Sequence, residues 1–395
     1  ISVAGPSALV AIGYVDPGNW ATDLGAGSRF GDSLLWVVAL SSGLGILFQT
    51  LSARLGEATG RDLAVLTREA APSATWLLWG IAELAMIATD LAEVLGSAIA
   101  LELLFHVPLA AGVVLTAADV IVLLALERRG SQTLERVAVG LFAIVGAGLT
   151  YEAIASRPSL GSIAAGLVPH ASALRDGPVV VACVGIIGAT VMPHNLYLQS
   201  SFAADRPSAP RPRTIAASLA IAMLFNAALV VVASAAFHAH GHAEVADLRE
   251  AHRLLAPALG GALAPAIFAC ALLASGQSST LSGTLAGQIV MNGMIDVRLP
   301  AWQRRLVTRA CAIVPAAVVV AIRGESSVTP LLVSSQVVLS LALPISLVPL
   351  VLLGSDPARM GALAFGPRLR AAAWLGVAIV VVANAMLVFE TLRAA

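Results

Sequence analysis

Two short polar segments interrupt long apolar stretches of the sequence, and both carry side chains that can bind a cation. Residues 16–19 read Asp-Pro-Gly-Asn, and residues 192–195 read Met-Pro-His-Asn. The Asp16 carboxylate, the amide oxygens of the two asparagines and the Met192 thioether form a ligand set for a divalent cation. A soft thioether adds little for hard Ca²⁺ or Mg²⁺ but suits Mn²⁺, Fe²⁺, Co²⁺ and Cd²⁺. Methionine is also a common packing residue, and the sequence leaves that alternative open.

The prolines in these segments predict that two helices unwind at membrane depth. Proline lacks an amide N–H and clashes with the preceding turn, so Pro17 and Pro193 each interrupt a helix. Unwinding frees the backbone carbonyls of Gly13 and Ala189, which lie three residues before each motif. Irregular backbone survives in a membrane only where it lines a cavity or is buried in protein. Simple kinks are the alternative, but two breaks at matching positions, each beside a metal-capable side chain, favour a binding site.

The composition indicates that these segments belong to a polytopic membrane protein. Of 395 residues, 58% are hydrophobic and 12% are charged, and the mean hydropathy is +0.89. The 23 basic residues, all arginine, balance 23 acidic ones, so a polyanionic partner such as nucleic acid has no electrostatic basis. Apolar runs long enough to cross a bilayer predict eleven transmembrane helices, at residues 3–29, 33–53, 75–104, 107–126, 133–155, 178–203, 214–238, 262–292, 306–322, 328–353 and 371–392.

The two breaks also relate the halves of the chain to each other. Aligning Asp16 with Met192 gives an offset of 176 residues, which carries spans one to five onto spans six to ten. Because five is an odd number, the second half must cross the membrane in the inverted sense. We expect an all-α fold with a first five-helix repeat at residues 1–156, an outward-facing connection at 157–177, a second, inverted repeat at 178–354, and a connection with an eleventh helix at 355–395.

The distribution of arginine predicts the orientation of this fold. A cytoplasmic N-terminus places 16 arginines in cytoplasmic connections and 7 on the opposite side. Membrane proteins carry their excess of basic residues in cytoplasmic loops. We therefore expect the N-terminus in the cytoplasm and the C-terminus outside.

The two breaks and their flanking residues resemble the Nramp family of proton-coupled divalent metal transporters, of the bacterial MntH type. The likeness covers the whole chain and includes Gly-Ala-Thr-Val before the second break and Leu-Tyr-Leu after it. It implies a leucine-transporter-like fold in the plasma membrane of a bacterium, which imports Mn²⁺ or Fe²⁺, and also Cd²⁺ or Co²⁺, with protons. By position, it implies metal ligands from the side chains or carbonyls of Asp16, Asn19, Met192, Gly13, Ala189 and Gln336.

Two positions depart from the pattern of that family. Gln199 stands where the family often carries histidine, so a role for that histidine does not transfer to this chain. Gly13 stands where alanine is usual, which leaves the carbonyl available and is expected to make the unwound turn more flexible.

A second group of ionisable residues lies in the third predicted span. Glu83, Asp90 and Glu93 are spaced by seven and three residues, so they share one broad helical face. Carboxylates inside a membrane must be protonated, paired or hydrated. The ninth span opens with Arg304 and Arg305, followed by Arg309, and these arginines can supply partners. Together with the aspartate of the first break, these groups predict a proton route, which the resemblance also implies. A purely structural salt-bridge network is the alternative.

The histidines allow several interpretations. We expect His194, in the second break, to relay protons or to brace the broken helix, because a strong imidazole ligand would slow metal release. His238, His240 and His242 look like a metal clip, but they begin a loop that is expected to face outward. We interpret these three as incidental surface histidines.

The leading functional hypothesis is a secondary transporter that acts as a monomer in the lipid bilayer and moves divalent metal ions and protons by alternating access, without a resident cofactor. A sodium-coupled symporter of a small organic substrate is the main alternative, but Asp16 opposes an anionic substrate. A metal channel would more naturally build its ligands by oligomeric symmetry. An intramembrane enzyme would need a catalytic motif, and the chain has no His-Glu-x-x-His, no Gly-x-Ser-x-Gly and no nucleotide-binding loop.

Overall fold

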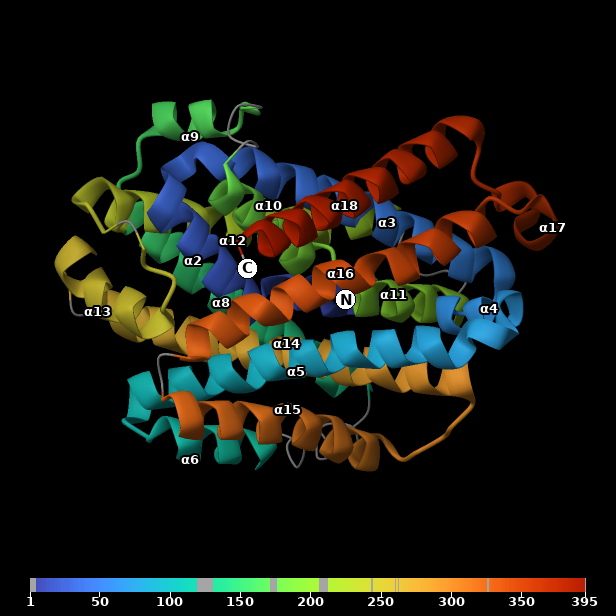
Figure 1. The fold of residues 1–395 in the computed structure, drawn as a ribbon, viewed down its shortest axis with the longest axis horizontal. Coiled ribbons are helices and arrows are strands. Elements are labelled where there is room, and N and C mark those ends of the chain that lie inside the picture. The colour runs from blue at the N-terminus through green and yellow to red at the C-terminus, as the bar shows by residue number, and fades with distance from the viewer. Residues whose placement is uncertain are drawn as a thin grey trace.

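The chain folds into a bundle of helices in the computed structural model, which describes residues 5–118, 131–170, 176–205, 212–242, 244–259, 261, 263–324 and 327–394. The α-helices, labelled in Figure 1, are α1 (Gly5–Ile12), α2 (Pro17–Phe30), α3 (Leu35–Thr59), α4 (Leu63–Ala70), α5 (Thr75–Phe105), α6 (Leu109–Leu115), α8 (Ser131–Ala155), α9 (Leu160–Gly166), α10 (Gly177–Thr190), α11 (Pro193–Asp205), α12 (Pro212–Ala236), α13 (Leu248–Leu259), α14 (Leu263–Ile295), α15 (Ala301–Arg323), α16 (Val328–Gly354), α17 (Pro357–Met360) and α18 (Pro367–Ala394). Short 3₁₀ turns include η1 (Gly13–Val15), η2 (Gly31–Leu34), η4 (Thr116–Ala118) and η6 (His238–His240).

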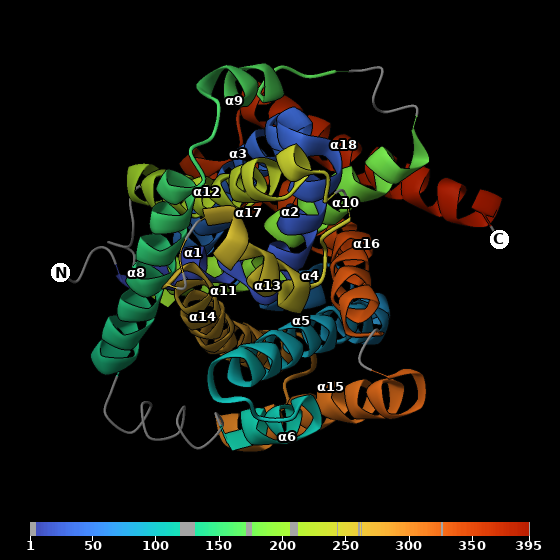
Figure 2. The ribbon, with the colours of Figure 1, turned by 90° about the vertical axis from the view of Figure 1, so that its left-hand side faces the viewer.

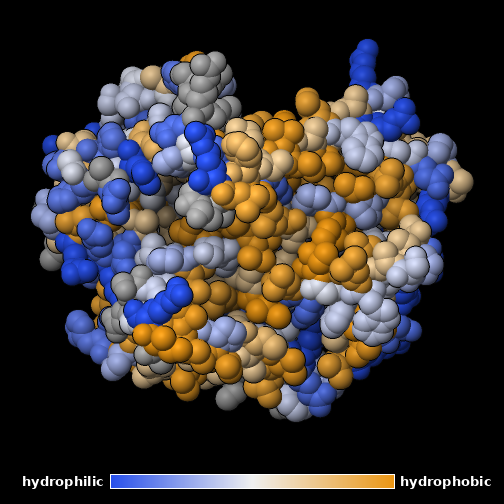
Figure 3. All heavy atoms as spheres, in the orientation of Figure 1, coloured by the Kyte–Doolittle hydropathy of each residue, from blue (hydrophilic) through white to orange (hydrophobic). Residues whose placement is uncertain are grey.

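The long helices run in broadly the same direction, and their apolar residues cover the sides of the bundle. Figure 1 views these helices from the side, and Figure 2 views many of them nearly end-on. In Figure 3, hydrophobic residues extend over the middle of the face shown, while hydrophilic residues gather toward its left and right ends. Large apolar side chains such as Leu224, Val318 and Leu375 are exposed on the surface of the bundle. A bundle with this distribution of exposed apolar residues is suited to a lipid environment.

The observed helices follow the predicted spans closely, with three qualifications. In the described part of the chain, eight segments are long and apolar enough to cross a membrane, and one of them joins α2 to α3. Helix α15 is not among the eight, although it coincides with the predicted ninth span. The predicted fourth span is seen only as far as Ala118, and the rest of it lies outside the described residues. The count of eleven crossing helices and the division into repeats stay predictions.

Both predicted helix breaks are present. The first span consists of α1, the turn η1 and α2, with Asp16 in extended backbone conformation between η1 and α2. The sixth span consists of α10 and α11, separated at Val191 and Met192. Pro17 and Pro193 occupy the first position of the outgoing helices, where the missing amide N–H would have no intrahelical partner. The prolines therefore stop one helix and start the next.

Glycines allow the broken helices to approach their neighbours closely. A methyl group added to Gly56 of α3 would overlap the Ser200 carbonyl oxygen of α11, and one added to Gly27 of α2 would overlap the Val230 carbonyl of α12. Without hydrophobic driving force between helices in lipid, such backbone contacts supply much of the association energy. Close backbone approach thus packs α11 against α3 and α2 against α12.

We expect Gly56→Ala to destabilise the protein, because the added methyl group overlaps backbone that has no freedom to move away. The loss should be about 1–3 kcal/mol, measured as a lower Tm of the purified protein in detergent. Gly43→Ala is the matched control in the same helix, since a methyl group there meets no atom within 4 Å. Equal Tm values for the two variants would show that the contact between α3 and α11 is loose.

Candidate functional site

The Asp16 carboxylate caps the outgoing half of the first broken helix. Its two oxygens accept hydrogen bonds from the backbone N–H groups of Gly18 at 3.2 Å and of Asn19 at 3.1 Å. Asp16 is fully buried. A helix N-terminus carries partial positive charge, which stabilises a carboxylate there. The carboxylate at the first break is thus held in a fixed orientation by the backbone that follows it.

Side chains from neighbouring helices satisfy most of the backbone that the first break exposes. The Tyr14 carbonyl accepts hydrogen bonds from the side-chain amides of Asn19 and, at 3.1 Å, of Asn226 in α12. The Val15 carbonyl accepts one from the hydroxyl of Ser275 in α14. The Gly13 carbonyl lacks its α-helical donor, because the residue four positions later is Pro17. This carbonyl therefore lies outside the α-helical hydrogen-bond pattern, at the start of the turn η1.

The second break repeats this arrangement. The Ala189 carbonyl also lacks an α-helical donor, because Pro193 stands four positions later. The Met192 side chain is fully buried, and its sulfur accepts a hydrogen bond at 3.7 Å from the side-chain amide of Asn195. In α3, Ser41 donates a hydrogen bond to the Thr190 hydroxyl at 3.2 Å, just before the break. The break is thus held on one side by a neighbouring helix while its sulfur stays in the interior.

Two glycines bring the two breaks and α16 together. An added methyl carbon at Gly13 would lie 2.6 Å from Nδ2 of Asn195, so the amide of the second break packs directly on the first. At Gly18, it would overlap the Gln336 side-chain amide and lie 2.9 Å from Oδ2 of Asp16. Gln336 and Asp16 therefore border the same glycine. The sequence-based expectation that Gly13 adds flexibility is incomplete, because this glycine also makes room for Asn195.

Oxygen atoms without a hydrogen-bond partner collect at this junction. Among the described residues, Asn19 Oδ1, Asn195 Oδ1 and Gln336 Oε1 are buried and accept no hydrogen bond. Leaving buried polar atoms unpaired costs about 1–3 kcal/mol each, and a cation bound at this junction could satisfy these oxygens. Among the described residues, no three His, Cys, Asp or Glu side chains are placed so that they could hold one metal ion together. The site therefore combines one carboxylate with neutral oxygens and a sulfur, which favours a borderline divalent ion over a tightly held zinc.

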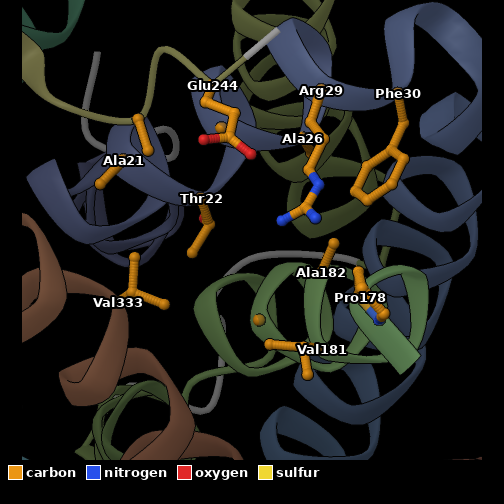
Figure 4. A pocket seen from close by; sticks show the side chains of 13 residues that line it. Ala21, Thr22, Ala26, Arg29, Phe30, Pro178, Val181, Ala182, Glu244 and Val333 are labelled. Carbon is orange, nitrogen blue, oxygen red and sulfur yellow. The ribbon is translucent and has the colours of Figure 1, made fainter.

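A cavity opens beside the first broken helix, one turn beyond the site. It has a volume of about 280 Å³ and is bordered by α2, α10 and α16, with Thr22, Arg29, Glu244 and Val333 in its lining. In Figure 4, Arg29 and Glu244 extend into this cavity from opposite sides, above Thr22. The Thr22 hydroxyl donates to the Asn19 carbonyl at 3.0 Å. The cavity therefore approaches the turn of α2 that carries Asn19.

The acidic face of the third span meets the arginines of the ninth, as predicted. The Nη2 atom of Arg304 donates hydrogen bonds to both carboxylate oxygens of Glu83, each at 3.0 Å. Arg309 lies 3.8 Å from the carboxylates of both Asp90 and Glu93. All three carboxylates thus have a cation beside them, as buried charges require.

Threonine and arginine groups of α14 and α15 complete this network. The Thr280 hydroxyl donates to Glu93 at 2.6 Å and accepts from Arg309 at 3.0 Å. Arg305 donates to the Thr280 carbonyl at 3.1 Å. His194 is buried, and its Nδ1 has no partner among the described residues. This nitrogen is available to exchange a proton or to bind water.

Sequence reasoning missed Asp23 and Asn226, and it named Arg309 only as one of three arginines that could pair with the acidic face. Asp23 is only 2% exposed, and its Oδ2 has no hydrogen-bond partner in the described part of the chain. It lies four residues after Asn19 on α2, and this spacing could have revealed it. Arg309 lies one turn after Arg305, so it shares that helical face. No sequence signal marks Asn226, because the bond of its amide to Tyr14 depends on tertiary packing.

Comparisons with known proteins agree with this geometry. Residues 7–390 match the family model described as natural resistance-associated macrophage protein-like. A divalent metal cation transporter MntH of Ralstonia nicotianae is 48% identical over 401 residues, which cover 98% of this chain and 91% of that protein. The MntH protein of a Nostoc species is 46% identical over 404 residues, which cover 99% of this chain and 91% of that protein.

Solved structures confirm the predicted fold class. A manganese transporter of Eremococcus coleocola, in complex with an aromatic bis-isothiourea substituted compound, is 36% identical and superposes with a TM-score of 0.89. That alignment covers 98% of this chain and 86% of the other. MhsT, solved with L-phenylalanine, is 18% identical with a TM-score of 0.64, which shows a shared fold alone.

The Met192 sulfur is expected to determine which ions the site accepts more than how tightly it binds them. We predict that Met192→Leu, which keeps the volume, weakens Cd²⁺ binding by about tenfold or more, retains part of the Mn²⁺ binding, and allows Ca²⁺ or Mg²⁺ to compete. Calorimetric titration of the purified protein measures all four ions. Met294→Leu, another buried methionine, is the control. Unchanged Cd²⁺ affinity with Ca²⁺ still excluded would reduce Met192 to a packing residue.

Proposed function

The chain belongs to the Nramp family, and on this premise we propose that it imports divalent transition-metal ions, with Mn²⁺ and Fe²⁺ as main substrates, coupled to protons. The metal is cargo that the protein binds and releases, and no resident cofactor is part of the proposal. In the proposed cycle, the site between the two breaks opens alternately to the two sides of the membrane. Transport of Cd²⁺ and Co²⁺ is part of the proposal because both suit a thioether ligand.

The observation that carries the proposal is the set of buried oxygen and sulfur atoms between the two breaks, several of which have no hydrogen-bond partner among the described residues. Asp16 supplies one negative charge, the amides of Asn19 and Gln336 supply neutral oxygens, and Met192 supplies sulfur. The carbonyls of Gly13 and Ala189 complete the proposed ligand set. A single carboxylate only half neutralises a divalent ion, which keeps binding weak enough for release during each cycle.

The proposed proton route begins where the first break rests on the acidic network. An added methyl carbon at Gly276 would lie 3.5 Å from both the Pro17 ring and the Glu93 carbonyl oxygen. The residue next to Asp16 is therefore a neighbour of the segment that carries Glu93. A proton displaced from Asp16 by the incoming metal can pass toward Glu93 and Asp90, where Arg309 and Thr280 hold both carboxylates in place. His194 and the Arg304–Glu83 pair border this proposed route.

The proposal includes a location and an orientation. The relatives of this chain named above are bacterial, which supports the plasma membrane of a bacterium as the site of action. The excess of arginine supports a cytoplasmic N-terminus and an external C-terminus. Because one chain supplies every proposed ligand, we propose that a monomer is sufficient for transport.

We expect Asp16→Asn to abolish Mn²⁺ binding and transport, because it keeps the shape of the side chain and removes the only negative charge at the break. Calorimetry on the purified protein and uptake into proteoliposomes measure the two effects. Glu152→Gln is the matched control, since it removes a buried carboxylate from another helix, α8. Retained Mn²⁺ binding in the Asp16 variant would move the site elsewhere in the molecule.

Neutralising the acidic network should separate proton movement from metal binding. We predict that Asp90→Asn and Glu93→Gln reduce metal-driven proton uptake by about tenfold or more, while the Kd for Mn²⁺ changes less. A pH-sensitive dye inside proteoliposomes reports the proton flux. Glu57→Gln changes an exposed carboxylate of α3 and should leave the flux unchanged. Wild-type proton fluxes in both network variants would make this acidic face structural.

A further inference from the structure

A second polar cavity lies at the end of α2, away from the helix break. It has a volume of about 280 Å³, and its lining includes Asp32, Ser162, His170, Ser234 and His238. These residues come from η2, α9, the segment after α9, α12 and η6. One carboxylate, two imidazoles and two hydroxyls therefore face one small volume, although they lie far apart in the sequence.

The His238 ring is oriented as a metal-binding imidazole. Its Nδ1 lies 2.9 Å from the Ser28 carbonyl oxygen, which can only accept a hydrogen bond. The proton therefore resides on Nδ1, and Nε2 carries the free electron pair. A ring nitrogen bonded in this way to a backbone carbonyl is the usual support of a metal-ligating histidine.

The cavity is open to His238 because the adjacent residue is a glycine. Gly31 has a φ of +59°, a left-handed conformation that favours glycine. An added methyl carbon there would lie 3.4 Å from Nε2 of His238 and 3.6 Å from the Ser234 hydroxyl. The absence of a side chain at this position leaves the space beside Nε2 unfilled.

Asp32, the next residue, contributes a carboxylate that is held but not fully paired. It is 8% exposed, and one oxygen accepts a hydrogen bond from the Ser162 hydroxyl. The other oxygen, Oδ1, is buried and has no partner among the described residues. A buried carboxylate with an unused oxygen that shares a cavity with an imidazole carrying a free electron pair offers two ligands to a cation.

We propose that Asp32 and His238 form a second divalent-metal site, separate from the site between the helix breaks, in the cavity that His170 also lines. Water completes the coordination, since the described residues contain no group of three such ligands already in place. Imidazole with carboxylate suits Mn²⁺, Co²⁺, Fe²⁺ and Zn²⁺. His238 is thus reassigned from an incidental surface histidine, whereas nothing in the structure gives His240 or His242 such a setting.

The position of this site suggests a role in metal capture. Phe30 lines both this cavity and the cavity beside α2 and α10 that approaches Asn19 (Figure 4). An ion bound by Asp32 and His238 would therefore lie next to the cavity that approaches the proposed transport site. This role rests on the proposed function, but the existence of the second site does not.

Counting bound Co²⁺ ions tests the second site directly. The full chain, purified in detergent, is titrated with Co²⁺, whose visible absorption reports nitrogen and oxygen coordination. We expect two ions per chain in the wild type, one in Asp16→Asn, and none in Asp16→Asn combined with His238→Gln. Asp32→Asn in the Asp16→Asn background should weaken binding of the remaining Co²⁺ ion by about tenfold or more. The glutamine amide can still donate to the Ser28 carbonyl, which protects the fold.

Matched variants separate this proposal from the proposed function. His240→Gln and His242→Gln should leave the Co²⁺ count unchanged. Loss of all Co²⁺ in Asp16→Asn, or one ion retained in the His238 combination, would overturn the second site. Two ions retained in Asp16→Asn would instead reject Asp16 as a ligand and leave the second site standing. In proteoliposomes, His238→Gln alone should raise the KM for metal and leave the maximal rate unchanged.

Discussion

The structure depends on one constraint, which is that a broken helix in a membrane must find a partner for every backbone group it exposes. At the first break, Asn19, Asn226 and Ser275 supply those partners for the carbonyls of Tyr14 and Val15. The carbonyl of Gly13 is left without its helical donor because Pro17 lacks an N–H. The same proline that ends the helix therefore takes a carbonyl out of the α-helical pattern, and the surrounding helices supply partners for the carbonyls that follow it.

Charge is distributed unequally between the proposed metal site and the proposed proton route. The junction of the breaks holds one carboxylate among neutral atoms, so a bound divalent ion is only partly compensated. The network on α5, α14 and α15 pairs three carboxylates with arginines, so its charges are almost balanced. A weakly compensated site can release its ion, whereas a balanced network can pass a proton without a large change in buried charge. Pro17, between the two parts, brings them into contact.

Small residues determine how closely these parts approach each other. Gly18 gives Gln336 access to the carboxylate of the first break, and Gly13 gives Asn195 access to its backbone. Gly31 leaves space in the polar cavity beside His238. At each position a single methyl group would separate groups that now lie side by side. The absence of a side chain is therefore as much a part of these sites as the polar residues.

The sequence by itself determined the helical class, both breaks and the chemical types of the side chains at them, because proline and apolar periodicity act through local backbone sterics and through the thickness of the bilayer. It also identified Glu83, Asp90 and Glu93 as one face, because helical spacing is local. Only the tertiary structure decided that Arg309 lies beside Asp90 and Glu93, that Gln336 borders Asp16, and that Asp32 shares a cavity with His238. These pairs are separated by many residues along the chain, and their contacts depend on how whole helices pack, which no local pattern encodes.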